Sequence, residues 1–311
     1  MRKLIAVVAV ISIVPATAAV GADLDELLTR SQEANYSAEQ IISCSTPDGV
    51  RDAVVRITQT GKDLTLSSSV TDDVEIAAGA GSWSLHESGG LVAEAAVRTG
   101  NEKAEPLYTV AEERAVEYLG RAAMSYLLIR DGSPRAELVF DDETGALVQA
   151  VTLTIDGDTY CERRFVSLEP DVAESLAATS GDSAQVEGTG PTDHEISGLP
   201  DEVAGFDLLD QYEDEDGLRF AYYSDGFFSF AVFETGAHAV ALPEATIVEV
   251  EPGVYQRVFT AGQVTYVWET KTGGMALVGD LPPDMHEPVL AAMPAPEDPG
   301  FLRRWWRNLF G

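Results

Sequence analysis

Apolar and polar residues alternate along much of the chain, a pattern with a period of two that is typical of β-strands. The clearest run covers residues 134–168, PRAELVFDDETGALVQAVTLTIDGDTYCERRFVSL. Turn-forming sequences at Asp142-Glu143-Thr144-Gly145 and Asp156-Gly157-Asp158 divide this run, so it predicts three antiparallel strands. Earlier segments separated by Gly or Asp predict further strands: AVVRITQ, DLTLSSSV, DVEIAA, GSWSLHE and GLVAEAAV.

Another hairpin is predicted at residues 218–234, LRFAYYSDGFFSFAVFE, where Ser224-Asp225-Gly226 separates two aromatic-rich runs. Asp-Gly suits the positive φ angles of tight hairpin turns. After the turn, both sides of the alternation are largely apolar, so this strand should be covered on both faces. Tyr222 and Tyr223 could contact a partner, because aromatic residues anchor interfaces. A place in the core accounts better for aromatics in such a strand.

Helical spacing is confined to short segments. Leu24, Leu27 and Leu28 predict a short helix near residue 23. Residues 109–129, TVAEERAVEYLGRAAMSYLLI, are ambiguous and allow a helix at their start.

The last third of the chain predicts more antiparallel sheet, from ATIVEVEPGVYQRVF and QVTYVWETKTG. Residues 275–293, MALVGDLPPDMHEPVLAAM, predict a strand and then a short closing helix. Pro282 and Pro283 suit the first turn of that helix, whereas Pro288 should shorten or kink it.

The length of 311 residues suits two domains, each large enough to bury its own core. Residues 171–198 are small and polar and predict a linker. The predicted fold class is α+β, mainly β, with domains at 23–170 and 199–294 and a tail at 295–311. We expect cleavage between Ser180 and Gly198 to yield two folded pieces. In limited proteolysis, a resistant linker beside degraded domains would contradict this boundary.

Residues 1–22 have the features of a secretory signal peptide: Arg2-Lys3, an apolar run and small residues before Asp23. Cleavage is expected after Ala22. An uncleaved membrane anchor fits less well, because the apolar run is short for a bilayer. No Cys follows the run to carry a lipid. The mature protein is therefore expected to be exported, to a periplasmic or other extracytoplasmic location.

The chain is strongly acidic, with 52 Asp and Glu against 20 Lys and Arg and a formal net charge of −32. Loss of the signal peptide removes Arg2 and Lys3 and no acid, so the mature chain is more acidic still. Such a chain lacks the basic face that phosphate backbones need, which excludes a general nucleic-acid binder. Solubility or a salty habitat explains the acidity better than one basic partner does.

The two cysteines, Cys44 and Cys161, both lie in predicted strands of the first domain. An even number of cysteines in an exported protein suggests a disulfide. The pair would join an early strand to the last strand of the first domain. Two separately buried thiols are the alternative.

The sequence shows no assembled catalytic or metal site. No two of the histidines, His86, His194, His238 and His286, have a spacing that a metal site would need. YEDEDG faintly resembles a calcium loop, but the register places Tyr212 and Tyr223 at its first and last positions. No nucleophile elbow, phosphate-binding glycine loop or Cys-His arrangement is apparent. We therefore expect a protein that is not an enzyme and uses no cofactor.

Three elements of the second half resemble the C-terminal domain of the MucB/RseB family of secreted sigma-factor regulators. They are Leu199-Pro200 with Gly205-Phe206, the hairpin Tyr223 to Ser229, and the sequence GDLPP from Gly279 to Pro283. Each is weak alone, but the three occur in the right order. Gly120-Arg121 and the hairpin in FDDETGALVQAVTLTIDGDTYCERRF resemble the first domain of that family more loosely.

The resemblance implies a first domain like the lipoprotein carrier LolA, an unclosed antiparallel half-barrel with helices over an apolar concave face. It also implies a regulator that binds the extracytoplasmic part of a membrane-spanning anti-sigma factor and protects it from regulated proteolysis. A lipid-like stress signal would release it. A carrier or sensor of lipid or lipoprotein is the alternative, and an enzyme of the cell envelope is least favoured. The acidity, Pro288 and the basic tail are not features of the family.

The C-terminal sequence FLRRWWRNLFG is the concentrated basic segment of this acidic chain. On a helix its apolar and polar residues fall on opposite halves, which predicts weak attachment to an anionic membrane. Packing of the apolar half on the protein's own body or on the partner is the alternative. The apolar half contains Phe301, Leu302, Trp305, Trp306, Leu309 and Phe310, and the other half contains Arg303, Arg304, Arg307 and Asn308.

Overall fold

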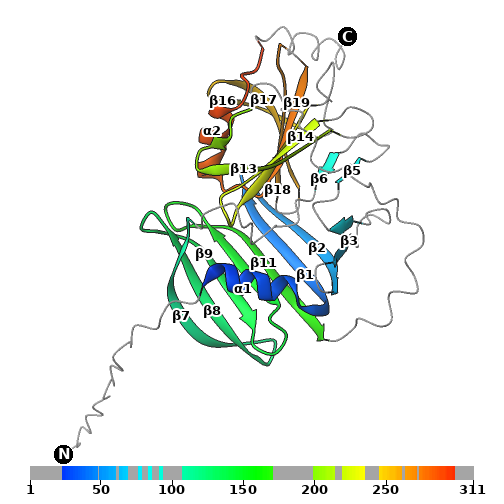
Figure 1. Cartoon of the computed structure of the whole chain (residues 1–311), viewed down its shortest axis with the longest axis vertical. Coiled ribbons are helices and arrows are strands. Elements are labelled where there is room, and N and C mark those ends of the chain that lie inside the picture. Colours follow the sequence, from blue (N-terminus) through cyan, green and yellow to red (C-terminus); the bar gives the residue numbers. More distant parts are fainter. Residues whose placement is uncertain are drawn as a thin grey trace, which may run out of the picture.

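The computed structural model describes residues 23–47, 49–60, 63–68, 76–78, 83–85, 91–93, 107–170, 199–213, 219–234, 245–260, 263–271 and 273–297. The signal peptide with Ala22, the linker 171–198 and the tail from Phe301 lie outside these ranges, so the expectations for them stay predictions. The described part is mainly β, with two helices and two large antiparallel sheets (Figure 1). The predicted fold class is confirmed.

The first domain is built on a nine-stranded sheet with the order β4-β3-β2-β1-β11-β10-β9-β8-β7. Its outer strands β4 and β7 do not pair with each other, so the sheet is unclosed, as expected. The strands are β1 (Asn35–Thr46), β2 (Gly49–Thr60), β3 (Asp63–Ser68), β4 (Ile76–Ala78), β7 (Thr109–Tyr118), β8 (Arg121–Arg130), β9 (Ser133–Asp141), β10 (Leu147–Leu153) and β11 (Thr159–Pro170). A separate pair, β5 (Trp83–Leu85) and β6 (Leu91–Ala93), forms a small second sheet.

The three strands predicted in residues 134–168 are β9, β10 and β11, and they pair in that order. The helix allowed at the start of residues 109–129 was wrong, because β7 and β8 form a hairpin there. Leu119 and Gly120 link them with φ angles of 52° and 73°, which suits a two-residue turn with both central residues at positive φ. Pairing with β8 thus overrides the helix propensity of the glutamates in β7.

Helix α1 (Leu24–Gln32) is the predicted opening helix, and it lies across one face of the first sheet (Figure 1). The Asp23 side chain caps it by accepting a hydrogen bond from the amide of Asp25 at 3.0 Å. Leu24 and Leu28 are buried against the sheet. At the other end, Gln59 Nε2 donates to the last carbonyl groups of the helix. The helix is therefore fixed at both ends.

The second domain is built on an eight-stranded antiparallel sheet with the order β12-β13-β14-β15-β19-β18-β17-β16. Helix α2 (Pro283–Ala292) follows the sheet and closes the domain, as predicted. The strands are β12 (Glu202–Val203), β13 (Phe206–Glu213), β14 (Arg219–Ser224), β15 (Ser229–Glu234), β16 (Thr246–Val250), β17 (Gly253–Thr260), β18 (Gln263–Glu269) and β19 (Gly274–Gly279).

Pro282 occupies the position before α2 and Pro283 is the first residue of the helix, as expected. Pro288 was expected to shorten or kink the helix; the shortening was wrong, because α2 continues past Pro288 to Ala292. Pro288 is exposed, whereas the next residues, Val289 and Leu290, are buried. Burial of this apolar pair holds the last turn in place despite the missing backbone donor.

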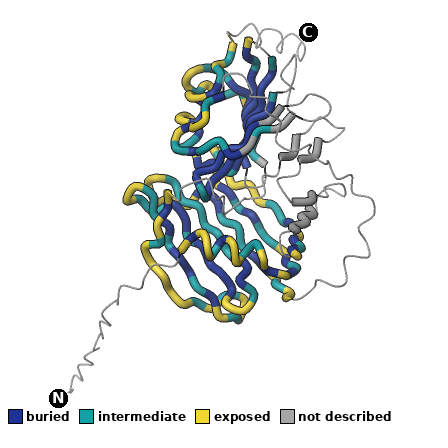
Figure 2. Tube along the Cα trace, viewed as in Figure 1, coloured by how far each residue is buried: buried dark blue, intermediate teal, exposed yellow. Residues whose placement is uncertain are grey.

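Strand β15 is buried on both faces, as its apolar alternation predicts. Phe230 and Val232 belong to the largest apolar cluster, and Ala231 and Phe233 belong to a smaller one on the other face. The largest cluster also includes Leu128 and other residues of the first domain, so the main core continues across the domain boundary. Figure 2 shows buried segments concentrated in the eight-stranded sheet of the second domain and where the two domains meet.

Cys44 and Cys161 are joined by a disulfide. They are directly opposed in the β1–β11 pair and both are buried. The disulfide connects an early strand to the last strand of the first domain across 117 residues of sequence. No helix among the described residues is long and apolar enough to cross a bilayer.

Candidate functional site between the two domains

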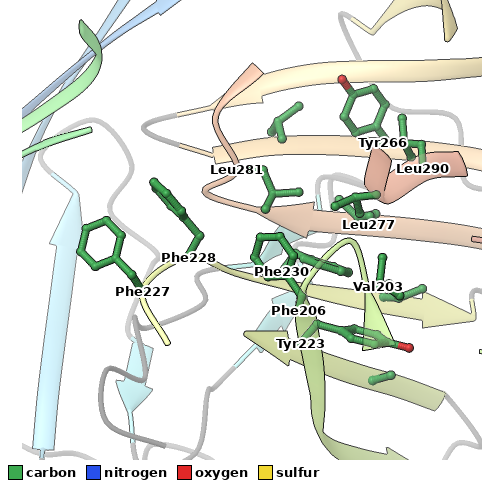
Figure 3. Packing of buried hydrophobic residues seen from close by; sticks show 14 of the residues in the cluster. Val203, Phe206, Tyr223, Phe227, Phe228, Phe230, Tyr266, Leu277, Leu281 and Leu290 are labelled. Atoms are coloured by element: carbon green, nitrogen blue, oxygen red, sulfur yellow. The ribbon is translucent and has the colours of Figure 1, made fainter. Parts of the chain in front are cut away.

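The loop between β14 and β15 runs from Asp225 to Phe228 and is held by its own side chains. The Asp225 Oδ1 accepts hydrogen bonds from the amides of Phe227 and Phe228 at 3.0 and 2.7 Å. Ser224 Oγ donates to the Phe228 carbonyl at 3.0 Å, and Gly226 takes a φ of 91°. The predicted strand therefore begins two residues later than its aromatic pattern suggests, and Phe227 and Phe228 belong to the loop (Figure 3).

The second carboxylate oxygen of Asp225 is bound by the first domain. Its Oδ2 accepts a hydrogen bond from the Tyr108 hydroxyl at 2.6 Å and another from Arg130 Nη1, at the end of β8. The Asp225 side chain is fully buried and that of Arg130 is 14% exposed. Burial raises the pKa of Asp225, while Tyr108, the loop amides and Arg130 act in the opposite direction. This carboxylate accepts four hydrogen bonds, two from each domain.

Aromatic contacts surround the ion pair. The Tyr108 ring lies 5.5 Å from the Phe227 ring and 6.2 Å from the Phe228 ring, both in edge-to-face geometry. The Arg130 guanidinium lies 5.8 Å from the centre of the Tyr108 ring. The loop therefore docks against the first domain through apolar as well as charged contacts.

The first motif element lies beside the same arginine. Gly205 has a φ of 83° in the β12–β13 turn, and a Cβ atom there would lie 2.5 Å from Arg130 Nη2. The next residue, Phe206, packs on Phe230 with ring centres 5.2 Å apart. The carbonyl of Pro200 accepts a hydrogen bond from the Tyr223 hydroxyl at 2.8 Å. Because glycine has no side chain, position 205 leaves room for the Arg130 guanidinium.

The third motif element lies beside β15, the strand that follows the loop. Gly279 is paired with Phe230, and a Cβ on this glycine would lie 2.5 Å from the Cβ of Phe230. Asp280 follows and its Oδ1 accepts a hydrogen bond from the Ser229 amide at 3.1 Å. Its Oδ2 lies 3.6 Å from Nη1 of Arg163, on β11 of the first domain. The GDLPP sequence therefore contacts both the hairpin and the first domain.

Three ion pairs among the described residues cross the domain interface, and all have the same polarity. The first domain supplies the arginines and the second domain supplies the aspartates. The third pair joins Arg135 Nη1 on β9 to Asp284 Oδ2 on α2 at 2.9 Å, with the arginine 3% exposed. We call this set the joint: Arg130–Asp225, Arg135–Asp284 and Arg163–Asp280, with Tyr108 and Gly205.

The residues singled out from the sequence have different places. Tyr223 is fully buried and Tyr222 is 7% exposed, so both lie in the core of the second domain. Tyr223 stacks on Phe230 at 4.9 Å. Among the described residues, no cluster of three or more His, Cys, Asp or Glu could hold a metal ion.

His286, the one histidine in the described ranges, is a core residue. Its Nε2 lies 2.9 Å from the Leu281 carbonyl, which can only accept, so this nitrogen carries the proton. Its Nδ1 therefore accepts a hydrogen bond from the Tyr266 hydroxyl at 2.9 Å. Burial lowers the pKa of His286 from 6.5 to about 4. The neutral ring is fully hydrogen-bonded in the fold.

This burial predicts an acid-dependent loss of stability. The contribution from neutral His286 is present above pH 6.5 and is lost as the pH falls to about 4, because the unfolded chain takes up the proton first. The loss amounts to at most about 3 kcal/mol. We expect His286→Gln, which can keep both hydrogen bonds, to show a flatter dependence of Tm on pH over this range. Superimposable pH profiles for the two proteins would contradict this prediction.

The arginines of the joint and Tyr108 were not identified from the sequence. Arg130 and Arg135 occur singly and Arg163 is next to Arg164, all in strand-like segments, where arginines usually face solvent. The signal that could have been used is the acid of the loop, because a single glycine separates Asp225 from two aromatic residues that must be buried.

Comparisons with known proteins were made by sequence and by structure. No family model matches the chain, and no curated protein matches it. The complex structure of Pseudomonas aeruginosa MucA/MucB is 17% identical, with a TM-score of 0.49, and the match covers 89% of this chain and 100% of that one. A crystal structure of MucB in complex with MucA(peri) is 16% identical, with a TM-score of 0.47 and the same coverage.

A crystal structure of an uncharacterized conserved protein from Thermus thermophilus is 12% identical, with a TM-score of 0.34. That match covers 51% of this chain and 94% of the other. The two MucB matches span the whole length of those chains, at low identity.

Proposed function

We propose that this protein is a non-catalytic extracytoplasmic regulator that binds the extracytoplasmic segment of a membrane-spanning anti-sigma factor and controls its proteolysis. The observation that carries this proposal is the convergence of the three motif elements on the joint. Residues near 205, 225 and 280 are far apart in sequence, yet each contacts an arginine of the first domain. The sequence features of a MucB/RseB-like regulator therefore act together in one place.

The chemistry of the joint suits binding better than catalysis. The Asp225 carboxylate is saturated by four donors, and Asp280 binds an amide and an arginine. Carboxylates held in this way have no free oxygen with which to take a proton from a substrate. One of the solved structures similar in fold is MucB bound to MucA(peri), and we propose a protein partner for this chain as well.

Co-expression tests the proposal. The mature chain should form a stable complex with the extracytoplasmic segment of an anti-sigma factor encoded beside it, and the complex should persist through gel filtration. Failure to form a complex, together with lipid that co-purifies with the chain, would support the alternative of a lipid or lipoprotein carrier. Lipid that co-purifies and lowers the affinity for the segment would support release by a lipid-like signal.

The tail adds a membrane contact to this proposal. Each buried apolar side chain is worth roughly 1.5–3 kcal/mol, and each Arg near an anionic surface adds about 1 kcal/mol. Ordering the segment offsets much of this, at about 1–2 kcal/mol per residue. We expect the full chain to co-sediment weakly with anionic liposomes at moderate salt and a chain ending at Gly300 not to do so. Equal, negligible binding by both would leave packing on protein as the role of the tail.

A further inference from the structure

We infer that the joint fixes a placement of the two domains that the partner requires, with Arg130 as its positioning residue; this inference rests on the proposed function. The partner's segment would contact both domains at once, so its affinity would depend on residues that it does not touch.

The three ion pairs join separate places in the two domains. They link β8 to the 225–228 loop, β9 to the first turn of α2, and β11 to Asp280 after β19. One contact between rigid bodies permits rotation in every direction, and two leave rotation about the line through them. Three separate contacts therefore fix the orientation of the second domain on the first.

The motif elements serve the domain interface as well as the second domain. Folding of the second domain alone does not explain them, because part of each serves the first domain. Gly205 leaves space for Arg130, Asp225 Oδ2 accepts hydrogen bonds from Arg130 and Tyr108, and Asp280 Oδ2 faces Arg163. The elements that make this chain resemble a regulator thus encode the placement of its domains. A partner that bound one domain alone would be indifferent to that placement.

Arg130 lies at the centre of the joint. Its guanidinium binds Asp225, lies over the Tyr108 ring and touches the position of Gly205, so it contacts two motif elements at once. The side chain is 14% exposed, whereas its other acidic neighbour, Asp131, is 93% exposed at 3.7 Å. A planar guanidinium suits this stacked and hydrogen-bonded site better than an ammonium group does.

The experiment titrates the partner's extracytoplasmic segment into four full-length proteins: the parent, Arg130→Met, Arg130→Lys and Arg114→Met. The control residue Arg114 lies on β7 in the same sheet and forms an exposed ion pair with Glu137, which is not one of the ion pairs of the joint. Calorimetry gives the Kd, small-angle X-ray scattering gives the domain arrangement, and circular dichroism checks that the sheets are intact. We expect Arg130→Met to bind at least about tenfold more weakly and to be more extended, a coupling of ordinary size.

Arg130→Lys should recover part of the affinity, because it restores the charge opposite Asp225, and Arg114→Met should bind like the parent. If Arg130→Met does not fold, Arg163→Gln tests the same inference at a pair that is partly exposed, with a smaller weakening expected. Parental affinity in a variant whose scattering shows a changed domain arrangement would overturn the inference and leave the proposed function standing. No binding by the parent itself would instead overturn the proposed function and, with it, the inference.

Discussion

Replacing Asp225 by Ala is expected to lower the free energy of unfolding by about 3–5 kcal/mol, because it removes one partner of a buried ion pair. Arg130, which is 14% exposed, would keep its charge, and its remaining acidic neighbour, Asp131, is exposed to solvent. The Tyr108 hydroxyl and the amides of Phe227 and Phe228 would lose their acceptor as well. Urea denaturation of the parent and the variant, followed by tryptophan fluorescence, measures the difference.

Asp131→Ala is the matched control, since Asp131 also lies near Arg130 but is 93% exposed. Its effect should be within about 0.5 kcal/mol, as for most surface substitutions. A loss of less than about 1 kcal/mol for Asp225→Ala would mean that the joint contributes little to the fold, contrary to the large cost of an unpaired buried charge.

Reducing the disulfide between Cys44 and Cys161 is expected to lower the free energy of unfolding by up to about 4–5 kcal/mol. The bond closes a loop across 117 residues of sequence, and in the chain-entropy model such long loops give the largest stabilisation. Unfolding in urea with and without a reductant measures the effect. A Cys44→Ala, Cys161→Ala double variant should match the reduced parent and should not respond to the reductant.

Thiol labelling of the denatured, unreduced parent checks the bond itself. No reactive thiol is expected, because both cysteines of the chain are used in the bond. Two reactive thiols per chain would show that the bond does not form.

Local features of the sequence predicted most of the strands and both helices. The turns at Gly145 and Gly157 adopt positive φ angles of 76° and 86°, and alternation on either side of them identifies β9, β10 and β11. These features depend on neighbouring residues, which a single sequence displays directly. Pairing partners that lie elsewhere are not displayed. For that reason the start of β7, which is rich in glutamate, was open to interpretation as a helix.

The joint could not be predicted, because its contacts are long-range. Asp225 lies 95 residues from Arg130 and 117 from Tyr108 in sequence. From the sequence, Asp225 suits a tight turn. The structure agrees, since its Oδ1 accepts hydrogen bonds from the amides of the loop. Nothing local indicated that its Oδ2 would bind the other domain. The motif elements were recognised for their order, and their contacts with arginines of the first domain emerged only from the fold.

Protection of the partner is the most direct measurement of the proposed function. The extracytoplasmic segment of the anti-sigma factor would be incubated with the protease that cleaves it, at increasing concentrations of the mature chain. Regulation by binding predicts that the cleavage rate falls in proportion to the fraction of segment bound, with weaker protection by Arg130→Met. A cleavage rate that stays constant while the segment is saturated with the chain would contradict it.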